Sequence, residues 1–279
     1  SKLHPDVPTH GSLESILKKP DEFIAQHENV DYIHVTPPCT SYTQGGNQLG
    51  LNTPDGQQMV RFFDLLAMVP EVPMVGVENV SNFWHFEDAR KAFIGRAKKL
   101  GYVVRHGTLT SGHFGSVQAR RKRMYVMLVK PEYEKCRPRW SHPQRSGRSK
   151  MGVHDVMSAN LELSQALQTP ETAVNFDVKQ KEWYHGPVPV ALLGNAPHRD
   201  PIHKDNRGYR VYDADGPAAT ITTTSTLAPG GATQLYRDNR WNTTIIRKLS
   251  VHEAWEVMGK PFDMDTSENQ RELKLKMIG

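Results

Sequence analysis

One short stretch constrains this chain most: an apolar run over residues 32–35 that stops at Pro37-Pro38 and then presents Cys39. Proline fixes φ and donates no backbone hydrogen bond, so the pair ends the run and stiffens the chain before the cysteine. The pattern predicts a buried strand that delivers a thiol to the carboxyl end of an α/β sheet, where such sheets bind ligands. Taken alone, the stretch leaves two interpretations open, a nucleophile or a small buried cysteine beside a turn.

The composition indicates a globular chain that is long enough to bury a core. Its 279 residues are 37% hydrophobic and 23% charged, and the net charge of +5 favours an acidic partner, with nucleic acid first. Cys39 and Cys136 have no CxxC spacing, which argues against a zinc site or a disulfide framework and for a reducing compartment. Without a signal peptide or a membrane-spanning run, we expect a cytoplasmic or nucleoid-associated protein that is not secreted.

Strand and helix signals alternate through the first 130 residues. Strands are predicted over 31–36, 74–77, 102–110 and 124–129, with helices over 53–69 and 86–100 between them. The helix start is well marked, because Thr53 suits the cap, Pro54 the first helical position and Asp55 the first turn. The alternation predicts an α/β domain over 1–130 with a Rossmann-like, doubly wound, mostly parallel sheet.

The character of the chain changes at Pro131. Residues 131–235 are rich in Pro, His, Arg, Ser and Gln and show weak periodicity, which predicts a smaller, irregular lobe. After it, Ser250 and Glu253 have the spacing of a capping box, and Gly259 suits the end of the helix that the box opens. We therefore expect a third segment, 236–279, that returns to pack on both preceding domains.

Three polar clusters follow predicted strands or connect them. They are Cys39, then Glu78 with Asn79, then Arg120, Arg121 and Arg123. In a doubly wound sheet such ends converge on one crevice. A thiol, a carboxylic acid and guanidinium groups suit nucleophilic addition to an electron-poor ring. Two alternatives stay open, since Glu78 and Asn79 could cap the segment after a strand and the arginine run could be a solvated face.

The clusters stand in the order found in C5-cytosine DNA methyltransferases, and the chain resembles that family along nearly its whole length apart from the lobe. The segment 37–39 resembles the Pro-Cys nucleophile motif, 78–80 is identical to Glu-Asn-Val, and 118–123 resembles Gln-x-Arg-x-Arg. Segments 219–221 and 247–261 resemble the end of a target-recognition region and the helix that follows it. Four motifs in order make the resemblance specific.

The resemblance implies a methyltransferase sheet, a target-recognition lobe and a known chemistry. A cytosine flipped out of double-stranded DNA takes the Cys39 thiolate at ring carbon 6 while Glu78 serves ring nitrogen 3. Carbon 5 then accepts a methyl group from S-adenosylmethionine, with S-adenosylhomocysteine as the product. The catalytic residues implied are Cys39, Glu78, Asn79, Arg121 and Arg123.

The resemblance also implies binding residues. Cofactor contacts are expected at Ser12, Leu13, Pro38 and Gln58. DNA contacts are expected at Ser41, Gln44, Gly45, Gln118, Arg120, Thr220 and Thr222. Loop 40–52 would close over the flipped base, and the lobe would read the major groove. No metal site is expected, because the His and Asp residues between 198 and 205 lack a recognised ligand spacing.

The chain departs from the family at the cofactor site. A Phe-x-Gly-x-Gly motif is absent from the 279 residues, Ser12 stands where an Asp is usual, and Gln58 replaces an apolar contact. We therefore expect a fragment or one part of a split enzyme, with a second chain or a further segment that supplies the Gly-rich motif. Without it, the strand before Cys39 would keep an unpaired edge, and the chain alone would not bind the cofactor measurably.

The arginine motif has two possible registers, Arg120 with Lys122 or Arg121 with Arg123, and the strand predicted from Met124 favours the second. Two other functions remain as alternatives. One is a tRNA cytosine-5 methyltransferase, against which the long lobe argues. The other is a non-catalytic DNA-binding subunit of a split methyltransferase.

Overall fold

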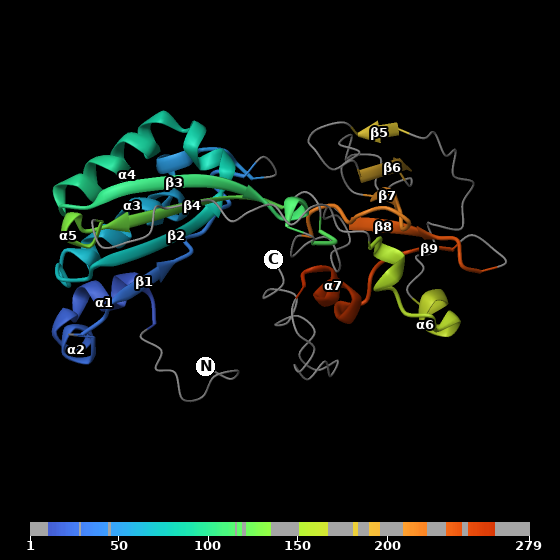
Figure 1. The fold of residues 1–279 in the computed structure, drawn as a ribbon, viewed down its shortest axis with the longest axis horizontal. Coiled ribbons are helices and arrows are strands. Elements are labelled where there is room, and N and C mark those ends of the chain that lie inside the picture. Colours follow the sequence, from blue (N-terminus) through green and yellow to red (C-terminus); the bar gives the residue numbers. More distant parts are fainter. Residues whose placement is uncertain are drawn as a thin grey trace. The chain divides into compact units, whose positions relative to one another are not determined.

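The computed structural model describes residues 11–27, 29–43, 46–114, 116–118, 121–134, 151–166, 181–183, 190–195, 209–221, 233–241 and 245–259 (Figure 1). The chain divides into two compact units, and each is described by itself. The first unit comprises Ser1–Leu109 and Lys122–Pro143, and the second comprises Thr110–Arg121 and Gln144–Gly279. The domain limits predicted at residues 130 and 235 stay predictions.

A four-stranded sheet forms the centre of the first unit, in the order β1-β2-β4-β3. The strands are β1 (Tyr32–Val35), β2 (Met74–Val80), β3 (Val103–Thr110) and β4 (Lys122–Val129). The mixed α/β class is confirmed: β1 runs parallel to β2, with Val35 opposite Val77, but β4 runs antiparallel to β2. The described strands of this sheet therefore include both a parallel and an antiparallel pair. The described part of the β3–β4 connection holds only the 3₁₀ turn η3 (Ser111–His113), and no long helix returns the chain to the starting end of the sheet.

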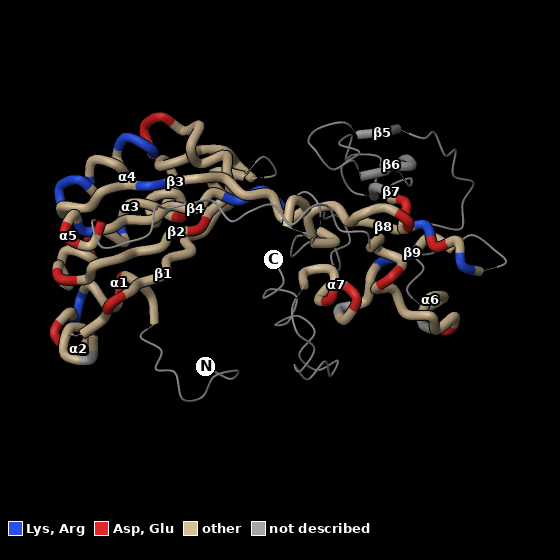
Figure 2. Tube along the Cα trace, in the orientation of Figure 1, with Lys and Arg blue, Asp and Glu red and all other residues tan. Residues whose placement is uncertain are grey.

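Helices cover one face of this sheet (Figure 1). They are α1 (Leu13–Lys18), α2 (Pro20–Gln26), α3 (Pro54–Leu66), α4 (Glu87–Lys99) and α5 (Pro131–Glu134), with the 3₁₀ turns η1 (Gly50–Asn52) and η2 (Ser81–His85). The predicted start of α3 is confirmed, because the Thr53 side chain accepts a hydrogen bond from the Gly56 N–H. In α4, acids occupy the first turn and bases the last, which suits the helix dipole (Figure 2).

The core of the first unit lies between α3, α4 and the sheet. Phe63 and Phe93 meet edge to face at 5.1 Å between ring centroids, and both are buried. From β2, Val75 and Val77 point into the same core. Because side chains alternate along a strand, Glu78 projects from the opposite face of the sheet, where it is only partly buried.

The second unit contains a five-stranded sheet in the order β5-β6-β7-β8-β9. The strands are β5 (Lys181–Trp183), β6 (Val190–Asn195), β7 (Tyr209–Asp213), β8 (Thr233–Asp238) and β9 (Ile245–Arg247), accompanied by η4 (Val153–Asp155), α6 (Leu161–Ala166) and α7 (Val251–Val257). Strands β7 and β8 are parallel, and the other neighbouring pairs are antiparallel. Strands β5, β6 and β7 and most of β8 fall within residues 131–235, where the sequence predicts a smaller, irregular lobe.

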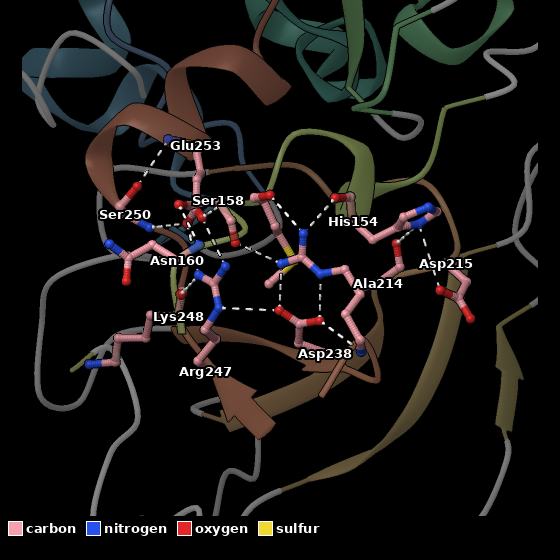
Figure 3. Close-up of polar contacts among 12 residues, drawn as sticks. His154, Ser158, Asn160, Ala214, Asp215, Asp238, Arg247, Lys248, Ser250 and Glu253 are labelled. Carbon is pink, nitrogen blue, oxygen red and sulfur yellow. Dashed lines mark hydrogen bonds and ion pairs between the residues drawn. The ribbon is translucent and has the colours of Figure 1, made fainter. Parts of the chain in front are cut away.

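A buried ion pair fixes the start of α7 (Figure 3). The predicted capping box is confirmed, since Ser250 accepts a hydrogen bond from the Glu253 N–H and Glu253 accepts one from the Ser250 N–H. The Glu253 carboxylate also accepts hydrogen bonds from both terminal nitrogens of Arg247, each at 2.8 Å, and from the Ser158 N–H at 2.7 Å. Arg247 is fully buried, so this carboxylate is saturated with donors.

A second pair lies beside the first and balances its charge. Arg240 donates to Asp238 at 2.8 and 2.7 Å and to the carbonyls of Met157 and Ser158. Asp238 is fully buried and stands 3.7 Å from the Arg247 guanidinium. Two acids and two bases therefore neutralise one another, which buried charges require.

Replacing Arg247 by methionine should leave the buried Glu253 carboxylate without its cation. We expect the free energy of unfolding to fall by about 3–5 kcal/mol, measured by urea denaturation followed through tryptophan fluorescence. The matched control is Arg105→Met, because Arg105 pairs with Glu134 in a half-exposed position. That pair should be worth less than about 1 kcal/mol. Equal losses in the two variants would contradict the assignment.

The same network predicts acid sensitivity. Burial alone would raise the pKa of Glu253, but the hydrogen bonds and charge of Arg247 hold this pKa below its usual value. Arg240 has the same effect on the pKa of Asp238, against the opposing effect of burial. A carboxyl group whose pKa is lowered by folding stabilises the fold at pH values above its unfolded pKa of about 4. This stabilisation is lost as the pH falls below that value. The urea midpoint should therefore decrease below about pH 4, and Glu253→Gln should reduce the slope of this decrease.

Candidate active site

Cys39 lies beyond the carboxyl end of β1, as predicted, but the strand is not buried as expected, because β1 stands at the edge of the described sheet and its residues are exposed or half-buried. After Pro37 and the exposed Pro38, the Cys39 carbonyl begins a turn by accepting hydrogen bonds from the N–H groups of Tyr42 at 2.9 Å and Thr43 at 3.0 Å. The thiol is free and partly exposed. Because these hydrogen bonds end on the carbonyl of Cys39 itself, they hold the cysteine in a defined position relative to the sheet.

Asn79 holds the segment before the cysteine. Its side-chain N–H donates to the Pro37 carbonyl at 2.9 Å, and its side-chain oxygen accepts from the Val80 N–H at 2.8 Å. Asn79 is 2% exposed, so its amide acts inside the protein and not on a ligand. The structure therefore places this predicted catalytic residue behind the thiol, where it orients the proline segment.

The first residues of the loop after Cys39 are hydrogen-bonded to the start of α3. Thr40 donates to the Asp55 carboxylate at 3.0 Å, the hydroxyls of Ser41 and Thr53 lie 2.5 Å apart, and the Gly50 N–H donates to the Ser41 carbonyl. From the sequence, Thr53 and Asp55 are recognised only as a helix start. Their second role depends on loop residues that fold back against them, which no local pattern reveals.

Glu78 and Arg123 come together on neighbouring strands. The Arg123 Nε lies 2.9 Å from a Glu78 carboxylate oxygen, and the two side chains are 16% and 22% exposed. The register explains the contact, because Arg123 faces Val80 across the β2–β4 ladder. Arg123, from the arginine run, thus contacts the predicted acid. Glu78 projects from β2, the strand that adjoins β1, directly after the residue that faces Val35, and Arg123 projects from β4 on the other side of β2.

The segment before Arg123 belongs to the second unit. Val117 is buried in that unit's core, its carbonyl accepts the Ala218 N–H at 2.8 Å, and Gln118 forms a parallel bridge with Ala218. The Arg121 carbonyl accepts the Ser111 N–H. The motif predicted at 118–123 therefore begins in one compact unit and ends in the sheet of the other.

Two predicted DNA contacts need correction. Ser41 is fully buried with its hydroxyl on Thr53, and Gln118 is 2% exposed. Neither position fits a direct contact with DNA. Thr220 is partly buried, and its carbonyl accepts a hydrogen bond from Gln234. Four further predicted contacts lie outside the described residues, namely Gln44, Gly45, Arg120 and Thr222.

Three predicted cofactor residues gather where α1 meets α3. Ser12 caps α1 by accepting the Ser15 N–H, and Leu13 packs against the core. Gln58 donates to the Glu14 carboxylate at 2.9 Å, which Arg61 also reaches at 2.8 Å. The hydrogen bond from Gln58 is the main cause that lowers the pKa of Glu14. Glu14 was missed from the sequence, where it looks like an ordinary acid in a first helical turn.

The remaining chemistry is limited in the described residues. No group of three or more His, Cys, Asp or Glu side chains there could hold a metal ion. The segment 198–205 lies outside that part of the chain. None of the helices that the structure describes is both long and apolar enough to cross a membrane.

Tyr42→Phe tests how firmly the turn is anchored. Tyr42 is fully buried, burial raises its pKa to about 12, and its hydroxyl donates to the Gly56 carbonyl at 2.6 Å. Loss of this bond should lower the free energy of unfolding by about 1 kcal/mol. Tyr133→Phe, at a half-exposed tyrosine of α5, is the control and should change stability little. A thermal melt of each variant decides, and equal melting temperatures would contradict the anchoring role.

Comparison with known proteins identifies the family and the fold. A family model described as C-5 cytosine-specific DNA methylase matches residues 8–279. No curated protein sequence matches the chain. Among solved structures, the Entamoeba histolytica methyltransferase EhMeth aligns with a TM-score of 0.66 at 14% identity, over 100% of this chain and 80% of that one.

Two other solved structures give the same fold. The S. pombe Dnmt2 methyltransferase aligns with a TM-score of 0.60 at 14% identity, over 94% of this chain and 75% of that one. A putative DNA modification methyltransferase encoded within an E. coli prophage aligns with a TM-score of 0.51 at 11% identity, over 92% and 77% of the two chains. The predicted methyltransferase fold and the family resemblance are thereby confirmed.

Proposed function

This chain belongs to the C-5 cytosine-specific DNA methylase family, and we propose that it transfers a methyl group to carbon 5 of a cytosine flipped out of duplex DNA. One observation carries the proposal: two reactive groups lie at the same end of the sheet. The half-buried Cys39 follows β1, and the Glu78–Arg123 pair projects from β2, which adjoins β1, and from β4, which adjoins β2. A nucleophile and an acid held by a cation are the groups that addition to a cytosine ring needs.

In the proposed reaction, the Cys39 thiolate forms a bond to ring carbon 6. The electron pair of the carbon 5–carbon 6 double bond moves to carbon 5, while Glu78 donates a hydrogen bond or a proton at ring nitrogen 3. Arg123 orients the Glu78 carboxyl through their contact. Carbon 5 then accepts the methyl group, loses its proton to a base, and the sulfur–carbon bond breaks to release the thiolate.

S-adenosylmethionine, when bound, would supply an electrophilic methyl group. Ser12, Leu13, Pro38 and Gln58 would hold it, with Glu14 as a further acceptor. Hydroxyl, amide, carboxylate and apolar groups gather where α1 meets α3, and this set suits one end of a nucleoside-type ligand. Because the chain has no Phe-x-Gly-x-Gly motif, we propose that a further segment or a second chain supplies the other end.

The proposed partner is double-stranded DNA in the cytoplasm or nucleoid. The net charge of +5 supports an acidic partner, and the second unit with its five-stranded sheet is large enough to act as the sequence reader. Among the described strands, β1 stands at the edge of its sheet, so a strand from the proposed additional segment could pair with it.

A duplex with 5-fluorocytosine at the target site tests the chemistry. Fluorine cannot leave carbon 5 as a proton does, so the sulfur–carbon bond should persist as an adduct that survives denaturing electrophoresis. We expect this adduct with the full-length protein and S-adenosylmethionine, and none with Cys39→Ser. Cys136→Ser is the matched control, since it removes the other cysteine and should leave the adduct yield unchanged. Methyl transfer by Cys39→Ser would contradict the proposal.

Parallel assays on duplex DNA and tRNA separate the proposal from its alternatives. We expect the labelled methyl group on duplex DNA. Transfer to tRNA alone would point to a tRNA cytosine-5 methyltransferase. DNA binding without adduct or transfer, in the presence of any additional segment, would point to a non-catalytic subunit.

A further inference from the structure

We propose that Asn82 is a positioning residue for Cys39, an inference that rests on the proposed function. Asn82 lies in η2, directly after β2, and its side-chain N–H donates to the Tyr42 carbonyl at 2.7 Å. The bond joins a side chain at the end of one strand to the backbone of the turn at the end of its neighbour. Asn82 lies outside the Glu-Asn-Val motif at residues 78–80.

Two asparagine amides bracket the thiol. Asn79 holds the Pro37 carbonyl before Cys39, and Asn82 holds the Tyr42 carbonyl after it. Both donors come from the same short stretch of backbone that also carries Glu78. The place of the thiol relative to the acid is therefore set by one segment rather than by separate parts of the fold.

The hydrogen bond from Asn82 adds to several other contacts that hold Tyr42 in place. The Tyr42 N–H donates to the Cys39 carbonyl, and its hydroxyl donates to the Gly56 carbonyl. Its own carbonyl accepts a hydrogen bond from the Asn82 side chain. Its ring meets Phe83 edge to face at 5.0 Å between centroids. The backbone and side chain of Tyr42 are thus held from several directions, and the turn that presents the thiol closes on this residue.

The residue that follows Asn82 is anchored in the core. Its neighbour Phe83 is fully buried and contacts Phe93 of α4. The N-cap residue of η2 is Val80, and no side chain makes a capping hydrogen bond at the start of this turn. The observed contact is to the cysteine turn, which favours positioning over local capping.

Asn82→Ala and the isosteric Asn82→Asp remove the donor and test the proposal. Displacement of a reacting group by about 1 Å can cost on the order of 100-fold. We expect kcat to fall by roughly 10- to 100-fold while KM for duplex DNA stays within about threefold. Gln57→Ala, at an exposed amide of α3, is the matched control and should keep wild-type kcat.

Hydrogen exchange provides a readout that needs neither DNA nor cofactor. The amides of Tyr42 and Thr43, which close the turn on Cys39, should exchange several-fold faster in both Asn82 variants. Protection in α4 should stay at the wild-type level.

Unchanged exchange at Tyr42 and Thr43 would overturn the proposal, and so would wild-type kcat in both variants. Faster exchange throughout α4 would show a general loss of stability and would also overturn it. If the wild-type protein transfers no methyl group to cytosine, the proposed function fails, but selective exchange at the turn would still establish the positioning contact.

Discussion

The hydrogen bond from the Asn79 amide to the Pro37 carbonyl is the contact on which the candidate site depends. Two consecutive prolines cannot donate to a sheet ladder, so the backbone before Cys39 leaves β1 without the bonds that would hold it. A buried side chain from the neighbouring strand instead donates to the Pro37 carbonyl, the acceptor that this segment retains. The same strand carries Glu78 on its other face, because side chains alternate along it. The thiol and the acid are therefore placed by two consecutive residues.

The two units solve the problem of burying polar groups in different ways. Around Cys39 the supporting groups are mostly neutral amides and hydroxyls, whereas the second unit buries whole charges at Arg247 and Glu253. Among the described residues, a neutral support leaves the electrostatics of Glu78 to its ion pair with Arg123. A charged and balanced network suits a structural role, since breaking it is costly and its members need not react.

Local patterns predict the parts of this protein that depend on neighbouring residues. Cys39 after a strand and the capping box at Glu253 are read correctly because a few adjacent residues determine them. The burial of Ser41 is not predictable in this way, since it depends on how a polar loop folds onto a later helix. The contact of Asn82 with Tyr42 is hidden for a similar reason, because the acceptor is a backbone carbonyl that any residue could offer. The five strands of the second unit are short, and long connections separate several of them, so their periodicity is weak.

The connection that ends at Arg123 joins the two compact units through the covalent backbone. Val117 is locked into the core of the second unit, where its carbonyl accepts the Ala218 N–H. A few residues later the chain enters β4, and Arg123 meets Glu78. An element fixed at both ends cannot change length without moving one of them. The backbone of this basic run is therefore held at one end by the core of the second unit and at the other by the sheet of the first. A basic run that only formed a solvated surface would not be held in this way.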